Sequence, residues 1–180
     1  MHHIVLLLSS FFMAGAVFAS SVSTVTVPHL SSAINQRLLV MKDVAGYKAE
    51  HHLPVEDLAR ERKVVASAQE DALAQGLDPQ SVLPFIQAQM DVAKAIQYRY
   101  LADWLSSPEP SWQPRSLDEV RGAIADQDKV ILNSIGQRLL AGGFSEADKA
   151  EMYNLLHAPH LSDADRHRLV DALVKIKRRL

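Results

Sequence analysis

Apolar residues recur at helical spacing in four successive segments of the chain, and each segment places polar or charged residues in the middle of its apolar face. In the first segment, at about 100° per residue, Arg37 and Lys48 fall on the same stripe as Met41 and Val44. An unpaired charge inside a protein is costly. Two cations on a core-facing stripe therefore indicate an anionic partner, which we expect to be a substrate.

The same feature recurs in the next three segments. Their apolar faces include Asp57, Arg60 and Glu61 in the second segment, Gln97 in the third and Arg121 in the fourth. A single residue of this kind is more often a side chain whose charged end reaches solvent. Its recurrence in four consecutive segments predicts a polar pocket inside a helical bundle.

Capping residues, prolines and glycines divide the chain into predicted helices. The first is expected over 31–50, with Ser31 or Ser32 as its N-cap, and a His-His-Leu-Pro sequence then interrupts it. The second is expected over about 56–75 and ends at Gly76. Both helices carry residues of the predicted pocket.

A third helix is predicted from Asp78-Pro79 to about Leu105, because aspartate is a good N-cap and proline is favoured at the first helical position. We expect Pro84 to bend its first turns. The proline-rich stretch 106–115 (SSPEPSWQPR) is predicted to be a connector rather than a helix.

Three further helices follow the connector. A capping box starting at Ser116 predicts a fourth helix that stops at Gly142-Gly143. The same capping signal recurs at Ser145–Asp148 and Ser162–Asp165, where it predicts two shorter helices. No strand-like alternation and no internal repeat is visible in the sequence. The predicted fold class is therefore all-α, a bundle of about six helices.

The first 19 residues have the pattern of a secretory signal peptide. An apolar run ends in Val17-Phe18-Ala19, with small residues where signal peptidase requires them. A retained membrane anchor is the alternative, but the run is short for a span of about 20 residues and is interrupted by Gly15. We expect cleavage near Ala19-Ser20, a periplasmic or secreted protein, and a flexible lead-in over 20–30.

Composition limits the classes of function that remain. Residues 31–180 are long enough for one domain with a sizeable core. The absence of cysteine excludes disulfides, thiol catalysis and zinc–thiolate sites. With 19 basic and 21 acidic residues, the chain has no charge excess of the kind that nucleic-acid or membrane-surface binding requires. We therefore expect neither partner once the signal peptide is removed.

The spacing of the polar residues carries a family resemblance. Arg37 is followed by Lys48, Asp57, Arg60-Glu61 and Gln97, within the sequences INQRLLVMKDVAGYKAEHHLPVEDLARERKVV and DPQSVLPFIQAQMDVAKAIQYRYLADW. This pattern resembles the helical chorismate mutases (type II), and in particular their exported, periplasmic-type gamma subclass. The resemblance covers 31–125, and we expect 126–180 to supply accessory helices.

The resemblance implies roles for the cationic and amide residues. Arg37 matches an arginine that binds a substrate carboxylate, and Arg60 matches one that supports the carboxylate on the ring. Lys48 matches the lysine that contacts a carboxylate and the ether oxygen of the bond that breaks. Gln97 matches the residue that donates a hydrogen bond to this oxygen. Arg121 resembles the fourth-helix arginine with which the exported subclass completes its pocket inside one chain.

The acidic residues have an implied role too, and two positions depart from the family pattern. Asp57 and Glu61 match positions that orient the substrate hydroxyl, through the backbone or through a carboxylate.

Ala93 stands where relatives often have a hydroxyl, so one contact is lost or made by the backbone. Val64 stands where the subclass can have a polar residue. Neither departure removes the main group of charged residues.

The implied reaction, a [3,3] rearrangement of chorismate to prephenate, agrees with these residue types. It is unimolecular and pericyclic, and it needs no nucleophile, metal or cofactor. Catalysis then rests on holding a reactive conformer and on stabilising negative charge at the ether oxygen. The resemblance implies a single-chain active site, and a homodimer is common among relatives.

Other interpretations stay open from sequence alone. A non-catalytic periplasmic module that binds a small dicarboxylate also needs arginines, but it has no need for Lys48 and Gln97 to converge on a neutral oxygen. His157, His160 and His167 suggest a metal site, yet no carboxylates cluster with them and surface histidines are the simpler interpretation. Three further side chains are expected in the core or the pocket wall, namely Tyr98, Tyr100 and Trp104.

Overall fold

A computed structural model describes residues 26–180. The predicted signal peptide, its cleavage site and the first part of the lead-in lie outside these residues. The described part is all-α, as predicted, with no strand and a single isolated bridge between Leu77 and Arg178. Its seven helices are α1 (Val27–Leu39), α2 (Met41–Glu50), α3 (Leu58–Ala74), α4 (Leu83–Ser106), α5 (Leu117–Leu140), α6 (Glu146–Leu155) and α7 (Asp163–Leu173).

The first predicted helix is present but begins earlier than expected and is broken once. Thr26 is its N-cap, and its hydroxyl accepts a hydrogen bond from the backbone N–H of His29. The expected cap at Ser31 or Ser32 is therefore wrong, and so is the lead-in beyond Thr26, because a proline in the first turn and buried Val27 extend the helix. Val40 alone separates α1 from α2.

The boundaries of α3 agree with the sequence, whereas the start of α4 does not. Asp57 caps α3, and its Oδ1 accepts a hydrogen bond from Arg60 N over 2.9 Å. Residues 79–82 form turns, and α4 begins at Leu83, not at Pro79. Pro84 lies in the first turn of α4, where proline is tolerated. It therefore marks the beginning of the helix and does not bend it.

The last three helices begin at the predicted caps. The hydroxyls of Ser116, Ser145 and Ser162 each accept a hydrogen bond from the backbone three residues later. Asp148 completes the capping box of α6 and also binds Arg138. Hydrogen bonds from the Ser145 hydroxyl and N–H and from Arg138 lower the pKa of Asp148 to about 2. Local sequence therefore determines where these helices start.

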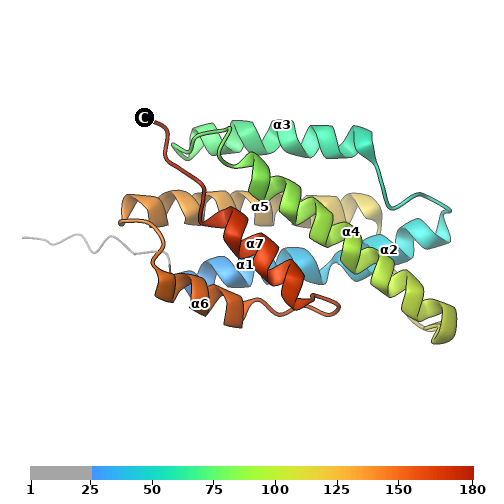
Figure 1. Ribbon diagram of the computed structural model, residues 1–180. Helices are drawn as coiled ribbons and strands as arrows, with labels where there is room; N and C mark the ends of the chain where they lie inside the picture. Colours follow the sequence, from blue (N-terminus) through green and yellow to red (C-terminus); the bar gives the residue numbers. More distant parts are fainter. Residues whose placement is uncertain (1–25) are drawn as a thin grey trace, which may run out of the picture.

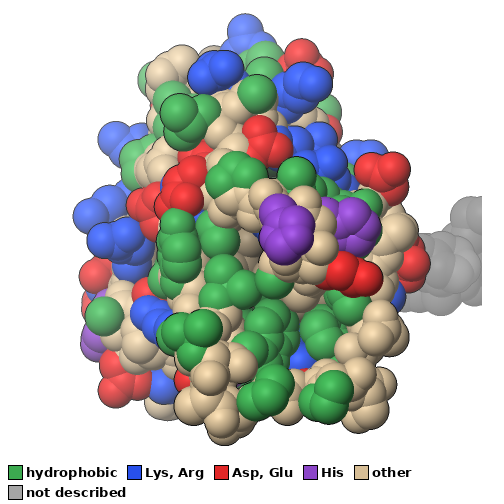
Figure 2. Space-filling view, turned by 90° about the vertical axis from the view of Figure 1, so that its right-hand side faces the viewer, with side chains coloured by type: hydrophobic (Ala, Val, Ile, Leu, Met, Phe, Trp, Pro, Cys, Tyr) green, Lys and Arg blue, Asp and Glu red, His purple; other side chains and the backbone are tan. Residues whose placement is uncertain are grey.

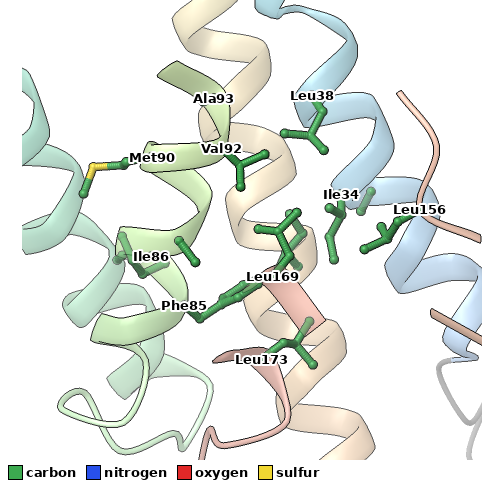
Figure 3. Packing of buried hydrophobic residues seen from close by; sticks show 14 of the residues in the cluster. Ile34, Leu38, Phe85, Ile86, Met90, Val92, Ala93, Leu156, Leu169 and Leu173 are labelled. Carbon is green, nitrogen blue, oxygen red and sulfur yellow. The ribbon is translucent and has the colours of Figure 1, made fainter. Parts of the chain in front are cut away.

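The helices form a bundle in which α4 crosses in front of α5 and the α1–α2 pair runs along the lower side (Figure 1). α3 lies along the upper edge and α6 at the lower left, whereas α7 crosses in front of α5 and α1. Buried residues of α1, α4 and α7 meet in the core (Figure 3). Phe85, Ile34 and Leu169 are at most 1% exposed. The 126–180 region thus packs against helices that carry the predicted pocket.

A buried amide joins α1 to the accessory helices. Asn35 Nδ2 donates to the carbonyl of Leu155 over 2.8 Å, and Asn35 Oδ1 accepts from the backbone N–H of His157 over 2.9 Å. Sequence periodicity places Asn35 on the polar face of its helix. The structure instead buries it to 7% exposure, because the end of α6 satisfies both ends of the amide.

The proline-rich connector between α4 and α5 is fastened to α2. Arg115 forms two hydrogen bonds with Asp43 Oδ2, at 2.9 Å from Nε and 2.7 Å from Nη2. The ring of Trp112 packs so closely on Gly46 that a Cβ there would lie 2.5 Å from it. Figure 2 shows the end of the molecule where α2, α4 and the connector meet, with hydrophobic side chains gathered on that face. The connector thereby fixes α2 against the start of α5.

No helix in residues 26–180 is both long enough and apolar enough to cross a membrane.

Candidate active site

A pocket of about 680 Å³, including its open mouth, lies among helices α1 to α5. Apolar residues such as Met41, Val44 and Leu117 form part of its wall. The pocket brings together all eight residues that the sequence singled out, namely Arg37, Lys48, Asp57, Arg60, Glu61, Ala93, Gln97 and Arg121. One chain supplies all of them.

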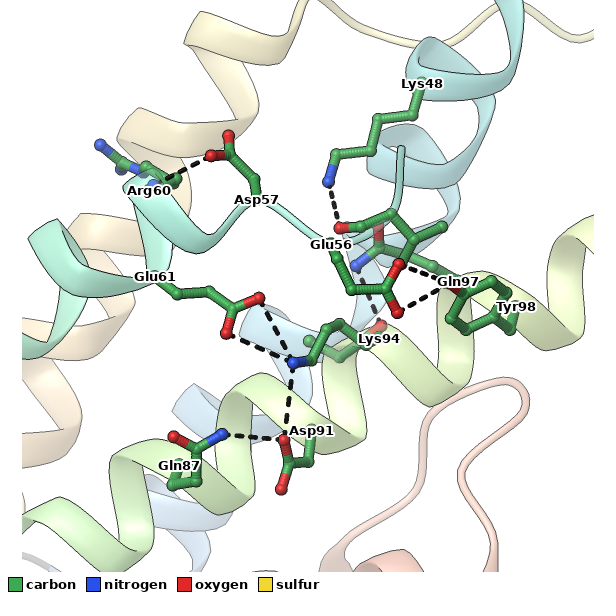
Figure 4. A network of polar contacts seen from close by, with 12 residues as sticks. Lys48, Glu56, Asp57, Arg60, Glu61, Gln87, Asp91, Lys94, Gln97 and Tyr98 are labelled. Carbon is green, nitrogen blue, oxygen red and sulfur yellow. Dashed lines mark hydrogen bonds and ion pairs between the residues drawn. The ribbon is translucent and has the colours of Figure 1, made fainter. Parts of the chain in front are cut away.

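Lys48 is a buried cation from the last turn of α2. Its residue exposure is 8%, and Nζ donates a hydrogen bond to the carbonyl of Val55 over 2.7 Å (Figure 4). Burial lowers the pKa of Lys48 below its ordinary value, although the nearby Asp57 carboxylate opposes this shift. An ammonium has three N–H donors, so two remain for a bound ligand.

Gln97 is a buried amide on α4. Its Nε2 donates to the carbonyl of Ala93 over 3.0 Å and lies 3.8 Å from the sulfur of Met41. Within the described part of the chain, its Oε1 is buried and has no hydrogen-bond partner. An unsatisfied buried polar group is costly, and such groups in native structures often mark functional sites. The second amide hydrogen has only the Met41 sulfur, a weak acceptor that a ligand oxygen can replace.

Arg37 has a protein partner that the sequence did not indicate. Its Nε donates to Asp128 Oδ1 over 2.7 Å, and the two side chains are 5% and 17% exposed. The sequence predicts an anionic partner for this cation, and Asp128 is such a partner within the protein itself. However, Arg37 Nη1 is buried with no partner among residues 26–180. The guanidinium is fixed from one side and retains donor capacity.

The acidic end of the pocket is formed by the N-terminus of α3. Asp57 uses one carboxylate oxygen to cap this helix, and the other lies 3.5 Å from Arg121 Nη2. Arg60 is half-buried and forms no ion pair in the described chain. It therefore offers a free planar guanidinium, a group suited to bidentate binding of a carboxylate.

Comparisons with known proteins agree with this geometry. Residues 29–98 match the family model described as chorismate mutase type II. The chain is 49% identical over 177 residues to the monofunctional chorismate mutase of Enterobacter agglomerans, with 98% of each chain covered. The chain belongs to the chorismate mutase family.

The family assignment extends to the whole described fold. The secreted chorismate mutase of Yersinia pestis is 45% identical over 94% of this chain and 89% of its own length. The crystal structure of the secreted chorismate mutase from Yersinia pestis superposes with a TM-score of 0.79, at 44% identity, over 84% of this chain and 98% of that one. The all-α chorismate mutase fold predicted from the sequence is thus confirmed.

Lys94 also lines the pocket, although it is not among the site residues predicted from the sequence. Its Nζ lies 3.3 Å from both carboxylate oxygens of Glu61. A signal for it exists in the sequence, since Lys94 stands four residues after Met90 and three before Gln97, on the same helical stripe. This position does not belong to the family motif on which the predicted site rests.

The three aromatic residues and the histidines that the sequence also singled out lie outside the pocket lining. Tyr100 is buried and Trp104 half-buried, but Tyr98 is 48% exposed and donates its hydroxyl hydrogen to Glu56. Placing Tyr98 in the core was therefore wrong, because Glu56 holds it at the surface. In the described residues no group of three histidines or carboxylates could hold a metal ion.

Proposed function

We propose that the protein catalyses the [3,3] rearrangement of chorismate to prephenate. The observation that carries this proposal is the convergence of Lys48 from α2 and Gln97 from α4 on one pocket that also contains three arginines. The relatives described above are named as chorismate mutases, which favours catalysis over a non-catalytic module that binds a dicarboxylate.

In the proposed mechanism the three arginines bind and orient the substrate. Chorismate carries two carboxylates, and Arg37, Arg60 and Arg121 offer planar guanidinium groups to them. Fixing both carboxylates folds the side chain of the substrate over its ring, so that the carbon atoms that must bond are held close together. The bound substrate is thereby restricted to a near-attack conformer, which removes part of the entropic cost of reaching the transition state.

Lys48 and Gln97 stabilise the charge that develops in the transition state. During the reaction the ether C–O bond breaks while a C–C bond forms, and negative charge develops on the ether oxygen; no proton is transferred. Each donor is already oriented by a backbone carbonyl, Val55 for Lys48 and Ala93 for Gln97. Preorganised donors of this kind each contribute about 2.7–4 kcal/mol. Two of them therefore approach the ~8 kcal/mol that a 10⁶-fold acceleration requires.

Asp57 and Glu61 complete the proposed site by orienting the hydroxyl of the substrate. Asp57 has one oxygen committed to the helix cap, so its contribution rests on the second oxygen or on the nearby backbone. Ala93 lines the pocket without a hydroxyl, and its side chain offers only an apolar contact.

A turnover assay tests this function directly. Purified mature protein should consume chorismate, measured as loss of its ultraviolet absorbance, and release an equal amount of prephenate. The control is the uncatalysed rate in the same buffer. Binding of chorismate by calorimetry with no consumption would support the non-catalytic alternative and refute the proposed activity.

We also propose that the protein is exported and cleaved near Ala19-Ser20. The support is the Val17-Phe18-Ala19 sequence together with the relatives named as secreted enzymes. N-terminal sequencing of protein from the periplasm or the medium should begin near Ser20. A retained Met1, or extraction only with detergent, would contradict export as a cleaved protein. The homodimer implied by the family resemblance stays a prediction, which light scattering can test.

A further inference from the structure

Lys94 occupies a position in the pocket that none of the proposed roles uses. It projects from α4 toward the N-terminal turn of α3, where Nζ lies 3.3 Å from Oε1 and 3.3 Å from Oε2 of Glu61 (Figure 4). The Lys94 and Glu61 side chains are 22% and 20% exposed. The pair is therefore largely shielded from water, and its charges interact more strongly than an exposed pair would.

A second carboxylate holds Lys94 from the other side. Asp91, one turn earlier on α4, lies 3.6 Å from Lys94 Nζ. Asp91 is itself fixed by Gln87 Nε2 at 2.9 Å and by Arg168 of α7 at 3.2 Å. This chain of contacts runs from an accessory helix to the pocket wall. It keeps the ammonium of Lys94 beside Glu61.

The two acids of the pocket differ in their surroundings. Asp57 is bonded to the backbone at the start of α3 and faces Arg121. Glu61 has Lys94 as its sole ion-pair partner in the described structure. Chorismate, the substrate of the proposed function, is a dianion, and an isolated carboxylate in its pocket would repel it.

We propose that Lys94 is a positioning residue that holds the Glu61 carboxylate on the pocket wall and offsets its charge against the dianionic substrate. This inference rests on the proposed function and deepens it. Since Lys94 acts through Glu61, its removal weakens the binding of substrate and transition state alike. Uniform weakening of this kind appears in KM and not in kcat.

The test compares kcat and KM of Lys94→Met with those of the native protein. We expect KM to rise at least about fivefold, with kcat changed by less than about twofold. Lys94→Arg keeps the charge and should stay within about twofold of the native KM. Lys149→Met is a matched control, because Lys149 also pairs with an acid three residues earlier, Glu146, but lies on α6 outside the pocket. It should change neither constant.

The same substitution made in Glu61→Gln protein distinguishes an indirect role of Lys94 from direct contact with the substrate. In Glu61→Gln protein there is no charge to offset, so adding Lys94→Met should change KM by less than about twofold. An equal loss in both backgrounds would mean that Lys94 contacts the substrate itself and would overturn the proposal. Unchanged KM in Lys94→Met, or a fall in kcat alone, would also overturn it.

Two further controls keep the outcomes distinct. Thermal unfolding followed by circular dichroism shows whether each variant is folded, and Lys94→Gln takes the place of Lys94→Met if the latter is not. If the native protein does not turn over chorismate, the proposed function fails. If the native protein is active and the folded neutral variant, Lys94→Met or its replacement Lys94→Gln, keeps the native KM, the role of Lys94 alone fails.

Discussion

Arg37 on α1 and Asp128 on α5 form an ion pair across the bundle, with Nε and Oδ1 separated by 2.7 Å. Asp128 is not among the residues that line the pocket, whereas Arg37 is. The carboxylate therefore fixes the guanidinium from outside the pocket and leaves the buried Nη1 for a substrate oxygen. Asp128 belongs to 126–180, so this region contributes to the site through a positioning contact.

Replacing Asp128 with alanine should reduce both stability and activity. The change leaves the Arg37 charge buried without its counterion, and breaking a buried pair in this way costs about 3 kcal/mol. Urea unfolding measures the free energy of unfolding, and chorismate turnover should fall because the guanidinium is no longer fixed. The control is Asp126→Ala, two residues earlier and exposed. Equal stability of the two variants would show that the pair contributes nothing.

Gly46 should not tolerate a side chain. A Cβ there would lie 2.5 Å and 2.7 Å from two ring atoms of Trp112 and 3.3 Å from Pro114. The ring has little freedom to move, because it also packs against Trp104 with 5.6 Å between ring centroids. Gly46→Ala should therefore lower the free energy of unfolding by about 1–3 kcal/mol, as overpacking does.

Gly122→Ala provides the matched comparison. Gly122 is also inside a helix, but nothing lies within 4 Å of its Cβ position. Alanine there should stabilise the protein by about 0.5–1 kcal/mol, because it restricts the unfolded chain. The two substitutions thus have opposite predicted signs in denaturant unfolding. Stabilisation by Gly46→Ala would show that the connector is not tightly packed on α2.

Lys48→Met should abolish most of the activity and preserve the fold. Methionine keeps much of the length of the side chain but removes the charge and the hydrogen-bond donors. Turnover should fall by at least about 10²-fold if the ammonium stabilises charge in the transition state. Circular dichroism should remain native, since a buried cation has been removed. Near-normal turnover in the folded variant would contradict the catalytic role.

The lowered pKa of Lys48 predicts opposite effects of alkaline pH on activity and stability. Burial lowers this pKa below the ordinary 10.5, so turnover that needs the ammonium should fall as pH rises through the lowered value. The folded state binds this proton less tightly than the unfolded chain does. Lys48 therefore costs stability below its folded pKa, and the cost disappears as pH rises toward 10.5. Lys48→Met should remove both effects, which pH profiles of turnover and unfolding can show.

Most of the fold was predictable because its signals are local. The caps at Ser145 and Ser162 are complete capping boxes in the structure, and such motifs depend only on neighbouring residues. The start of α4 was missed for a tertiary reason. Asp78 N donates to the carbonyl of Lys177, and Leu77 forms an isolated bridge with Arg178. Because this segment pairs with the C-terminal residues, it forms a turn and not the beginning of a helix.

The composition of the pocket was predictable, whereas its internal pairing was not. Helical periodicity and spacing identified Arg37, Lys48 and Gln97, since these depend on position within one segment. The contacts of Arg37 with Asp128 and of Lys94 with Glu61 join segments 91 and 33 residues apart. Their formation depends on how the helices pack, which a single sequence without its fold does not specify.

The arginine on α5 predicts that each chain holds a complete site. Arg121 and Arg37 line the same pocket of one chain. Arg37→Ala and Arg121→Ala chains, each weakly active, should therefore stay weakly active after they are mixed and allowed to exchange subunits. Recovery toward about a quarter of native turnover would show that subunits share a site, since about half of randomly paired dimers are mixed and one of the two shared pockets in each would hold both arginines.

Gln97 predicts how turnover depends on pH. An amide donates its hydrogen bond at any pH, whereas a glutamate must be protonated to donate. The native protein should therefore show little pH dependence from this position between about pH 5 and 8. Gln97→Glu should favour acid, because an ionised carboxylate would repel the negative charge that develops on the ether oxygen. Its turnover should fall as pH rises through the pKa of the new carboxyl, which burial should raise above about 4.3. Turnover of both proteins measured across this range decides the matter, since a constant ratio between the two profiles would mean that Gln97 does not face the ether oxygen.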